Sequence, residues 1–314
     1  MNLTLKELID SHRTITILSH INPDADAIGS SLGLYALLRG YGKQVEVVNH
    51  SVDIPMHLDF LPNFSKIKRQ ISYDKSLIIA CDCGSMDRLG FDLLGRVIIN
   101  IDHHHTNQNY GTLNLVDCDM SATSQVVYSL TKEQFHISSD IATCFYTALV
   151  SDTNYFTIES VDESTFAFAH ELISLGANQK RVGFNLTQRR SLASLRILGR
   201  ALGSLELHRD ATVASIIIDQ DMISAAGARM SDLDGIVEYA RSLVTVEVGI
   251  LLVRYDKDIR VSLRSKKEDI SIVARYFGGG GHRYASGFTQ KFGSVEEILD
   301  RILKRIDTLG WREF

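Results

Sequence analysis

Short apolar runs rich in β-branched residues are the feature that most restricts how this chain can fold. Four of them occur in the first hundred residues: "TITILSH" (14–20), "QVEVVNH" (44–50), "SLIIACD" (76–82) and "RVIINID" (96–102). Their length and composition predict buried strands. A helical pattern, "AIGSSLGLYALLRGYG" (27–42), separates the first two and stops at Gly40 or Gly42. Strands that alternate with helices predict a parallel sheet with helices on both faces.

The rest of the chain continues this alternation. Helical patterns at 121–133 and 139–153 follow the predicted sheet, and residues 187–203 read as a helical interdomain linker. Further strands are predicted at 212–219, 246–256 and 259–265, between helices near 230–241 and 294–307. We therefore predict an α/β fold: an N-terminal parallel-sheet domain over 1–186, the linker over 187–203, and a smaller C-terminal α/β domain over 204–314.

Composition restricts the partners of the chain. Its 314 residues are 45% hydrophobic and 23% charged, as in an ordinary globular protein with room for two cores. The net charge of −5 argues against a long nonspecific nucleic-acid groove, which needs a basic surplus, but it leaves a small anionic substrate open. Apolar runs stay shorter than the roughly 18 residues of a membrane span, and the N-terminus has no signal-peptide core. Four cysteines without a CxxC pair predict the reducing cytoplasm.

Polar residues with metal-binding side chains stand where three of the predicted strands end. "SHINPDAD" supplies His20, Asp24 and Asp26, the next run ends in Asp82, and another ends in Asp102-His103-His104. The carboxyl ends of parallel strands meet at one edge of a sheet, so we expect these side chains in one crevice. Asp152, in "LVSDTNYF", is a further candidate from a following helix.

Each of these residues also has a purely structural interpretation. Asp24 or Asp26 can cap the helix near Ala27, Asp82 can be a turn residue, and the histidines can lie in a solvated loop. The coincidence of HxxxDxD, an isolated acid and DHH at successive strand ends favours a metal site instead. Crowded carboxylates repel one another unless positive charge lies among them, and oxygen ligands mixed with imidazole suit Mn²⁺. Two such ions are the usual apparatus of phosphoester hydrolysis.

The ordered motifs resemble those of the DHH-DHHA1 phosphoesterases. They are "SHINPDADAIGS", "ACDCGS", "IDHHHTN", "LVSDT" and, near the C-terminus, "GGGGHRYASGF". The resemblance spans nearly the whole chain and is closest to the NrnA-type oligoribonucleases (nanoRNases), which also dephosphorylate 3′-phosphoadenosine 5′-phosphate. It implies a DHH domain, a DHHA1 substrate-binding domain and two divalent metal ions, with Mn²⁺ favoured.

The resemblance also implies a role for each residue. His20 and Asp24 would hold one metal, Asp26 and His103 the other, with Asp82 bridging them and Asp152 completing the site. A hydroxide held between the ions would attack phosphorus. Asp102 would orient an imidazole, and His104 would face the phosphate or protonate the leaving group.

Three positions depart from the family pattern. His105 lies where the family often has proline, so we expect it to be a neighbour of the site and not a ligand. Ala25 and Asn154 stand where glycine is frequent. Neither change removes a ligand, although both alter the local loop.

The C-terminal motif predicts substrate binding. The backbone of Gly279, Gly280 and Gly281 can approach an anion closely, and His282 follows at once. The resemblance implies that Arg264 points at the nonscissile phosphate of the substrate. The structural alternatives are a flexible turn and a surface arginine, and a solvated helix face is the favoured interpretation of Arg189, Arg190, Arg196 and Arg200.

Several functions remain open on these residues. The leading hypothesis is hydrolysis of short single-stranded RNA or DNA oligonucleotides to mononucleotides, and of 3′-phosphoadenosine 5′-phosphate to AMP. A cyclic or linear dinucleotide phosphodiesterase and a non-enzymatic nucleotide-sensing module are the alternatives.

The family's pyrophosphatases carry a different C-terminal domain, and RecJ-type exonucleases are longer. We expect neither long duplex nor membrane as a partner. Homodimerisation, the preferred length, strand polarity, RNA or DNA preference and native metal are left open.

Overall fold

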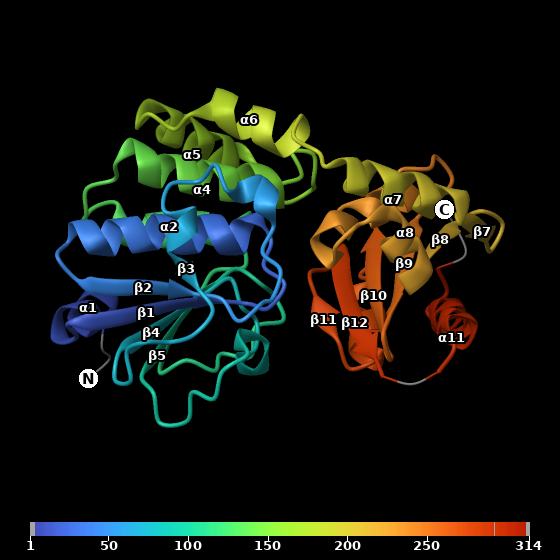
Figure 1. The fold of residues 1–314 in the computed structure, drawn as a ribbon, viewed down its shortest axis with the longest axis horizontal. Coiled ribbons are helices and arrows are strands. Elements are labelled where there is room, and N and C mark those ends of the chain that lie inside the picture. Colours follow the sequence, from blue (N-terminus) through green and yellow to red (C-terminus); the bar gives the residue numbers. More distant parts are fainter. Residues whose placement is uncertain (1–3, 292, 312–314) are drawn as a thin grey trace. The chain divides into compact units, whose positions relative to one another are not determined.

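The apolar runs of the first hundred residues form strands of one parallel sheet (Figure 1). In the part of the chain that this computed structural model describes, residues 4–291 and 293–311, the sheet has six strands in the order β3-β2-β1-β4-β5-β6. The strands are β1 Thr14–Ser19, β2 Gln44–Val48, β3 Ile67–Lys68, β4 Leu77–Cys81, β5 Ile98–Asp102 and β6 Leu113–Val116. The four predicted strands are confirmed. The edge strands β3 and β6 escaped prediction because two to four residues carry too little pattern.

The order of the strands reverses in the middle of this sheet. From β1 the chain goes outward to β2 and β3, then returns to β4 on the other side of β1 and continues outward to β5 and β6. In open parallel sheets the crevice beyond the carboxyl ends at such a reversal is where ligands bind. The strand ends that carry the candidate residues therefore meet at the expected place.

Helices cover one face of this sheet, and a different kind of cover lies on the other. One core packs Ile15, Ile79 and Ile101 against the α-helices, with Phe145 at its centre. On the opposite face, residues that include Ile78 lie against the 3₁₀-helix η3 and adjoining loops. The predicted α/β fold with a parallel sheet is confirmed, and on this second face the short β4–β5 connection forms the 3₁₀-helix η3. The helices of this region are α1 Leu5–Ser11, α2 Ala25–Gly40, η1 Met56–Leu58, η2 Phe64–Lys66, η3 Met86–Leu89, α3 Thr123–Thr131, α4 Ser139–Asp152, α5 Glu163–Ser174 and α6 Gln179–Thr187.

Helices α2 and α4 approach each other closely because α2 carries glycines on the shared face. A Cβ at Gly29 would lie 2.6 Å from the carbonyl oxygen of Cys144, and one at Gly33 would lie 2.3 Å from the ring of Phe145. Asp24 caps the start of α2, and Asp152 is the last residue of α4. The contact therefore sets where two candidate ligands lie.

The C-terminal region forms a second, mixed sheet with its own cores. Among the described residues its order is β11-β12-β10-β9-β8-β7, and β8 and β9 are its parallel pair. One face packs against α10 and α11, and part of the other packs against α7, α8 and α9. The strands are β7 Glu206–His208, β8 Val213–Ile218, β9 Val248–Tyr255, β10 Asp258–Ser265, β11 Gly280–Gly281 and β12 Ala285–Gln290. The helices are α7 Leu192–Gly203, α8 Gln220–Ala226, η4 Met230–Leu233, α9 Ile236–Arg241, α10 Ser271–Tyr276 and α11 Val295–Thr308.

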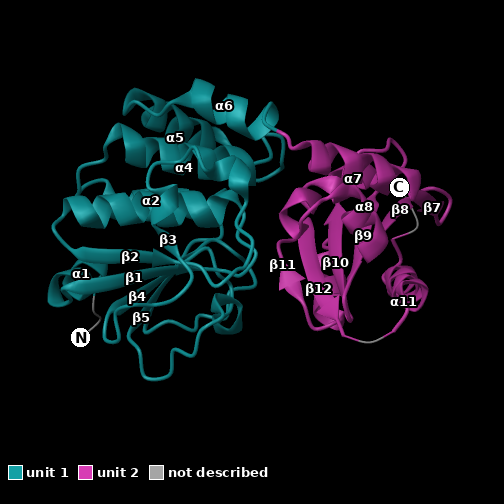
Figure 2. Ribbon diagram, in the orientation of Figure 1, with its two compact units in different colours: residues 1–189 teal, residues 190–314 magenta. Residues whose placement is uncertain are grey.

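The chain divides into two units, residues 1–189 and 190–314 (Figure 2). The predicted continuous helix over 187–203 is interrupted: α6 ends at Thr187, and α7 begins after Ser191, whose side chain accepts a hydrogen bond from the backbone N–H of Ser194. Helix α7 then buries Ile197 in a core of the second unit. The domain limits 1–186, 187–203 and 204–314 stay a prediction. Within the described residues, every helix is too short or too polar to cross a membrane.

The α2–α4 contact yields a stability prediction. Gly29→Ala places a methyl group against backbone, so we expect it to destabilise the fold by roughly 1–3 kcal/mol. Gly40, in the same helix, has nothing within 4 Å of an added Cβ, and Gly40→Ala should be neutral or stabilise by up to about 1 kcal/mol. Chemical denaturation of both variants measures the difference, and equal effects would contradict the proposed close contact.

Candidate metal centre and active site

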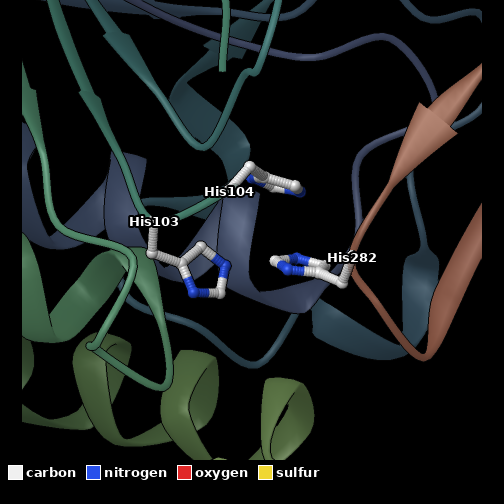
Figure 3. Close-up of side chains that lie close together, drawn as sticks. All are labelled: His103, His104 and His282. Atoms are coloured by element: carbon white, nitrogen blue, oxygen red, sulfur yellow. The ribbon is translucent and has the colours of Figure 1, made fainter. Parts of the chain in front are cut away.

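The carboxyl edge of the parallel sheet brings together all six predicted metal ligands. His20 follows β1, Asp82 follows β4, and His103, which is labelled in Figure 3, follows β5. Asp24 and Asp26 lie at the N-terminus of α2, and Asp152 ends α4. Their ligand atoms form clusters within which no two atoms are more than 4.8 Å apart.

The first cluster contains His20, Asp24 and Asp82. The His20 Nε2 atom lies 3.7 Å from Asp24 Oδ2 and 3.5 Å from Asp82 Oδ2. Its other ring nitrogen, Nδ1, lies 2.9 Å from the carbonyl oxygen of Ile21. Asp24 caps the helix and also faces the cluster. Its Oδ1 accepts the hydrogen bond that caps α2, while its Oδ2 faces His20.

The second cluster contains Asp26, His103 and Asp152. The His103 Nε2 atom lies 3.8 Å from Asp26 Oδ2 and 3.3 Å from Asp152 Oδ2. The His103 Nδ1 atom lies 3.1 Å from the carbonyl oxygen of Met120. In both clusters, therefore, a backbone carbonyl occupies Nδ1 and turns Nε2 toward carboxylates.

Asp82 lies between the two clusters with one oxygen toward each. Oδ2 is 3.5 Å from His20 Nε2, and Oδ1 is 3.8 Å from His103 Nε2. The residue has φ of 56°, a left-handed conformation that costs a non-glycine residue about 1–3 kcal/mol. A backbone hydrogen bond to the Ile101 carbonyl holds it there. The strained backbone aims this carboxylate between the histidines.

The electrostatics of the site show a deficit of positive charge. Burial and the neighbouring Asp82 raise the pKa of Asp26 to about 7, and burial raises the pKa of Asp152 well above its usual range. Burial alone would lower the pKa of both histidines, but the carboxylates outweigh it. They raise the pKa of His103 to about 9 and that of His20 to about 10. The carboxylates hold protons in the cluster when no other cation is present.

The residues fit divalent metal ions. The distances of 3.3–3.8 Å from Nε2 to the carboxylates exceed those of good hydrogen bonds. They suit two ligands on one ion, since each ligand atom lies about 2.0–2.2 Å from a metal. Bound cations would replace the protons, and the mixture of oxygen and imidazole donors is one that Mn²⁺ accepts.

Asp102 and His104 form a separate pair beside these clusters. The His104 Nδ1 atom lies 2.7 Å from Asp102 Oδ1, and Asn107 donates to the other oxygen of Asp102. The charge of His104 and its hydrogen bond lower the pKa of the buried Asp102 to about 2. An ionised Asp102 is therefore placed to orient the ring of His104.

The structure adds residues that the sequence interpretation missed. Thr123, at the start of α3, donates its backbone N–H to Asp26 and its hydroxyl to Asp82, at 2.7 and 3.0 Å. The backbone of Ser124 also donates to Asp26, and Arg88 Nη2 lies 3.2 Å from His20 Nδ1. The signal available for Thr123 was its place at the predicted start of a helix, where N–H groups face anions.

The departures from the family pattern cause little disturbance. His105 is exposed and belongs to none of the candidate clusters among the described residues. Asn154 has φ of 44°, in the left-handed region that glycine adopts readily and asparagine tolerates. Ala25 is the first residue of α2 and is buried.

The predicted substrate-binding residues lie in the second unit. Arg264, on β10, donates from Nε to Glu238 at 2.7 Å and from Nη1 to the Leu263 carbonyl. His282, also labelled in Figure 3, lies in the turn between β11 and β12. The presence of glycine at positions 279 and 281 also has a structural reason. An added Cβ at Gly279 would lie 2.1 Å from the carbonyl oxygen of Gly287, and one at Gly281 would lie 2.5 Å from that of Ala285. Gly280 lies between them in β11. Their binding roles stay a prediction.

Asp82 is the residue whose loss should matter most. Asp82→Asn keeps the shape but removes the charge between the clusters, so bound Mn²⁺ and turnover should both be nearly abolished while the fold survives. Metal analysis and circular dichroism on the same sample measure this. Asp87→Asn, an exposed acid of η3, is the matched control. Near-normal activity of Asp82→Asn would rule out a bridging role.

The three consecutive histidines should differ in their effects. His103→Ala should lose metal and activity together, since its Nε2 faces carboxylates. His104→Ala should retain metal and lose mainly kcat, and His105→Ala should change little. Metal content and steady-state kinetics of the three variants separate these roles. An equal loss in all three would show that the assignment of this segment is wrong.

Two protein-family models match this chain, one in each unit. Residues 14–149 match the DHH family, N-terminal domain, and residues 206–308 match the DHHA1 domain. The chain is 29% identical over 310 residues to the bifunctional oligoribonuclease and PAP phosphatase NrnA of Thermus thermophilus, covering 98% of this chain and 93% of that protein. It is 24% identical to the cyclic-di-AMP phosphodiesterase PdeA of Listeria monocytogenes, covering 96% of this chain and 49% of that protein.

Solved structures contain the same fold. The crystal structure of an exopolyphosphatase-related protein from Bacteroides fragilis superimposes with a TM-score of 0.85 at 26% identity, covering 97% of this chain and 95% of that one. The motifs, the two matched domains and the near-full-length similarity lead to one assignment. The chain belongs to the DHH family, with a DHH domain followed by a DHHA1 domain.

Proposed function

We propose that this protein is a metal-dependent phosphoric ester hydrolase that cleaves short oligonucleotides to mononucleotides and removes the 3′-phosphate of 3′-phosphoadenosine 5′-phosphate. The observation that carries the proposal is Asp82, whose two oxygens face the histidines of two separate acidic clusters. Similarity to the oligoribonuclease and PAP phosphatase NrnA over nearly the whole chain supports the choice of substrate.

Two divalent cations, proposed to be Mn²⁺, would use the two clusters. His20 and Asp24 would hold one, Asp26, His103 and Asp152 the other, and Asp82 would contribute to both. Such ions neutralise phosphate charge and lower the pKa of water near neutrality. The chain supplies the rigid placement: the Ile21 and Met120 carbonyls orient the two imidazoles, and Thr123 and Ser124 orient Asp26 and Asp82.

The reaction consumes one water molecule. The water oxygen forms a bond to phosphorus, the bond from phosphorus to the leaving nucleoside oxygen breaks, and that oxygen takes up a proton. His104 is the proposed donor of this proton or of a hydrogen bond to the phosphate, and Asp102 is a positioning residue that holds its ring.

The second unit is proposed to bind the part of the substrate that does not react. Arg264 and the segment 279–282 offer a guanidinium, backbone N–H groups and an imidazole for a second phosphate. Single strands of a few nucleotides fit this set better than long duplex, because a net charge of −5 argues against a long nonspecific nucleic-acid groove. We place the protein in the cytoplasm.

A dinucleotide phosphodiesterase is the second candidate function. The 24% identity to the cyclic-di-AMP phosphodiesterase PdeA favours it, and the same residues suit that chemistry. A product-resolved assay with Mn²⁺ on di- to decanucleotides, 3′-phosphoadenosine 5′-phosphate, a cyclic dinucleotide and pyrophosphate separates the functions. Preference for the cyclic compound would replace our proposal, and tight nucleotide binding without turnover would indicate a sensor.

The proposed division of roles predicts selective effects in the second unit. Arg264→Ala and His282→Ala should lower kcat/KM for a dinucleotide roughly 10- to 1000-fold, because a charge-assisted phosphate contact is lost. A small aryl phosphodiester has no second nucleotide, so its cleavage should be largely spared. Parallel kinetics on both substrates measure this. Equal losses would mean that these residues serve the chemistry or the fold.

A further inference from the structure

Strand β10 presents a row of polar side chains on one face. Ile259, Val261 and Leu263 point into the core formed with α10 and α11. The alternate residues Arg260, Ser262 and Arg264 therefore point to the other face, and all three are half-buried. Two arginines thus stand four residues apart on one strand face.

The surroundings of this row are small or polar on the side of β12. Arg260 pairs with Thr289, Ser262 with Gly287 and Arg264 with Ala285. On the other side, Leu251 and Val253 of β9 lie under α9 and its preceding loop. A small pocket is lined by the three row residues together with Asp234 and Gly235 from that loop. The β10 and β12 residues on this face are small or polar, and the apolar residues of the pocket come from η4, α9 and β9.

The two arginines differ in what holds them. Glu238 accepts from Arg264 Nε with one oxygen and from Arg241 with the other, so Arg264 is held in place by a fixed partner. In the described part of the chain, Arg260 makes no ion pair within 4.0 Å, although Asp234 lines the same pocket. Arg260 is available to an external anion.

The spacing of the row suits a nucleic-acid strand. Same-face residues repeat every two positions, so Arg260 and Arg264 are separated by roughly 13 Å along the strand. This is comparable with the distance between a phosphate and the next but one in an extended single strand. The Arg264 end of β10 adjoins the turn that contains His282, because the Ser265 N–H donates to the Tyr284 carbonyl. Arg260 is at the remote end.

We propose that Arg260 binds a phosphate of the substrate beyond the one assigned to Arg264, with Ser262 between them as a hydrogen-bond donor. The inference rests on the proposed function and adds to it a determinant of chain length. A dinucleotide or a bisphosphonucleotide ends before it reaches Arg260, whereas an oligonucleotide of about four or five residues reaches it.

The experiment compares Arg260→Gln with wild type on a dinucleotide and a pentanucleotide. We expect kcat/KM for the pentanucleotide to fall roughly 5- to 20-fold and that for the dinucleotide to stay unchanged. The slope of log kcat/KM against log salt should become less steep by about 0.7 for the pentanucleotide alone. Arg254→Gln is the matched control, because Arg254 pairs with Ile259 on the opposite face of the sheet and is exposed. Ser262→Asp, which adds a negative charge to the row, should show the same selective loss.

Equal effects on the two substrates, or no effect on either, would overturn the inference. Binding of a fluorescent pentanucleotide is measured by anisotropy on the same variants, so the role of Arg260 is tested even if wild type hydrolyses neither substrate. Hydrolysis of neither would remove the proposed function, whereas weaker pentanucleotide binding in Arg260→Gln alone would still support the assigned contact. If the pentanucleotide binds Arg260→Gln as tightly as wild type, the proposed contact between Arg260 and a substrate phosphate is ruled out.

Discussion

Repulsion among buried carboxylates is the constraint on which the catalytic unit depends. Asp26, Asp82 and Asp152 approach the imidazole of His103 from three different parts of the fold, and solvent cannot screen them fully. Neighbouring groups partly offset the negative charge of these carboxylates. The backbone N–H groups at the start of α3 donate to Asp26, and the histidines are driven toward protonation. A protein gains little stability from such a cluster, and divalent cations would neutralise its charge.

The cluster keeps its shape because rigid elements carry it. Asp82 is held in a left-handed conformation, and α2 lies against α4 so closely that Gly29 has no room for a methyl group. Asp24 and Asp26 move with α2, whereas Asp152 moves with α4. Ligands that come from separate elements stay in register only if those elements cannot slide. Placement of this kind lowers the reorganisation that binding and catalysis require.

In the second unit, the alternation of strand residues places apolar side chains on one face of β10 and polar side chains on the other. One face of its sheet is closed by α10 and α11, whereas the core on the other face is built from residues of β8 and β9. On this second face, β10 carries arginines and serine where β9 carries leucine and valine. Glu238 holds Arg264 from α9, so a helix that builds the core also positions a residue proposed to contact substrate. The residues proposed for hydrolysis and those proposed for substrate binding thus belong to units with separate cores.

The sequence determined more of the catalytic unit than of its surroundings. Short apolar runs rich in β-branched residues favour buried strands, and parallel strands bring their carboxyl ends to one edge. His20, Asp82 and His103 were therefore predictable, with Asp24 and Asp26 in the same motif. The tertiary structure decided the rest. The hydroxyl of Thr123 meets Asp82 across 41 positions, and Glu238 meets Arg264 across 26. The helix break before Leu192 and the 3₁₀ cover over β4 also depend on packing. Local pattern reports how a segment folds, whereas contacts between distant segments depend on how whole elements pack, which no short stretch of sequence encodes.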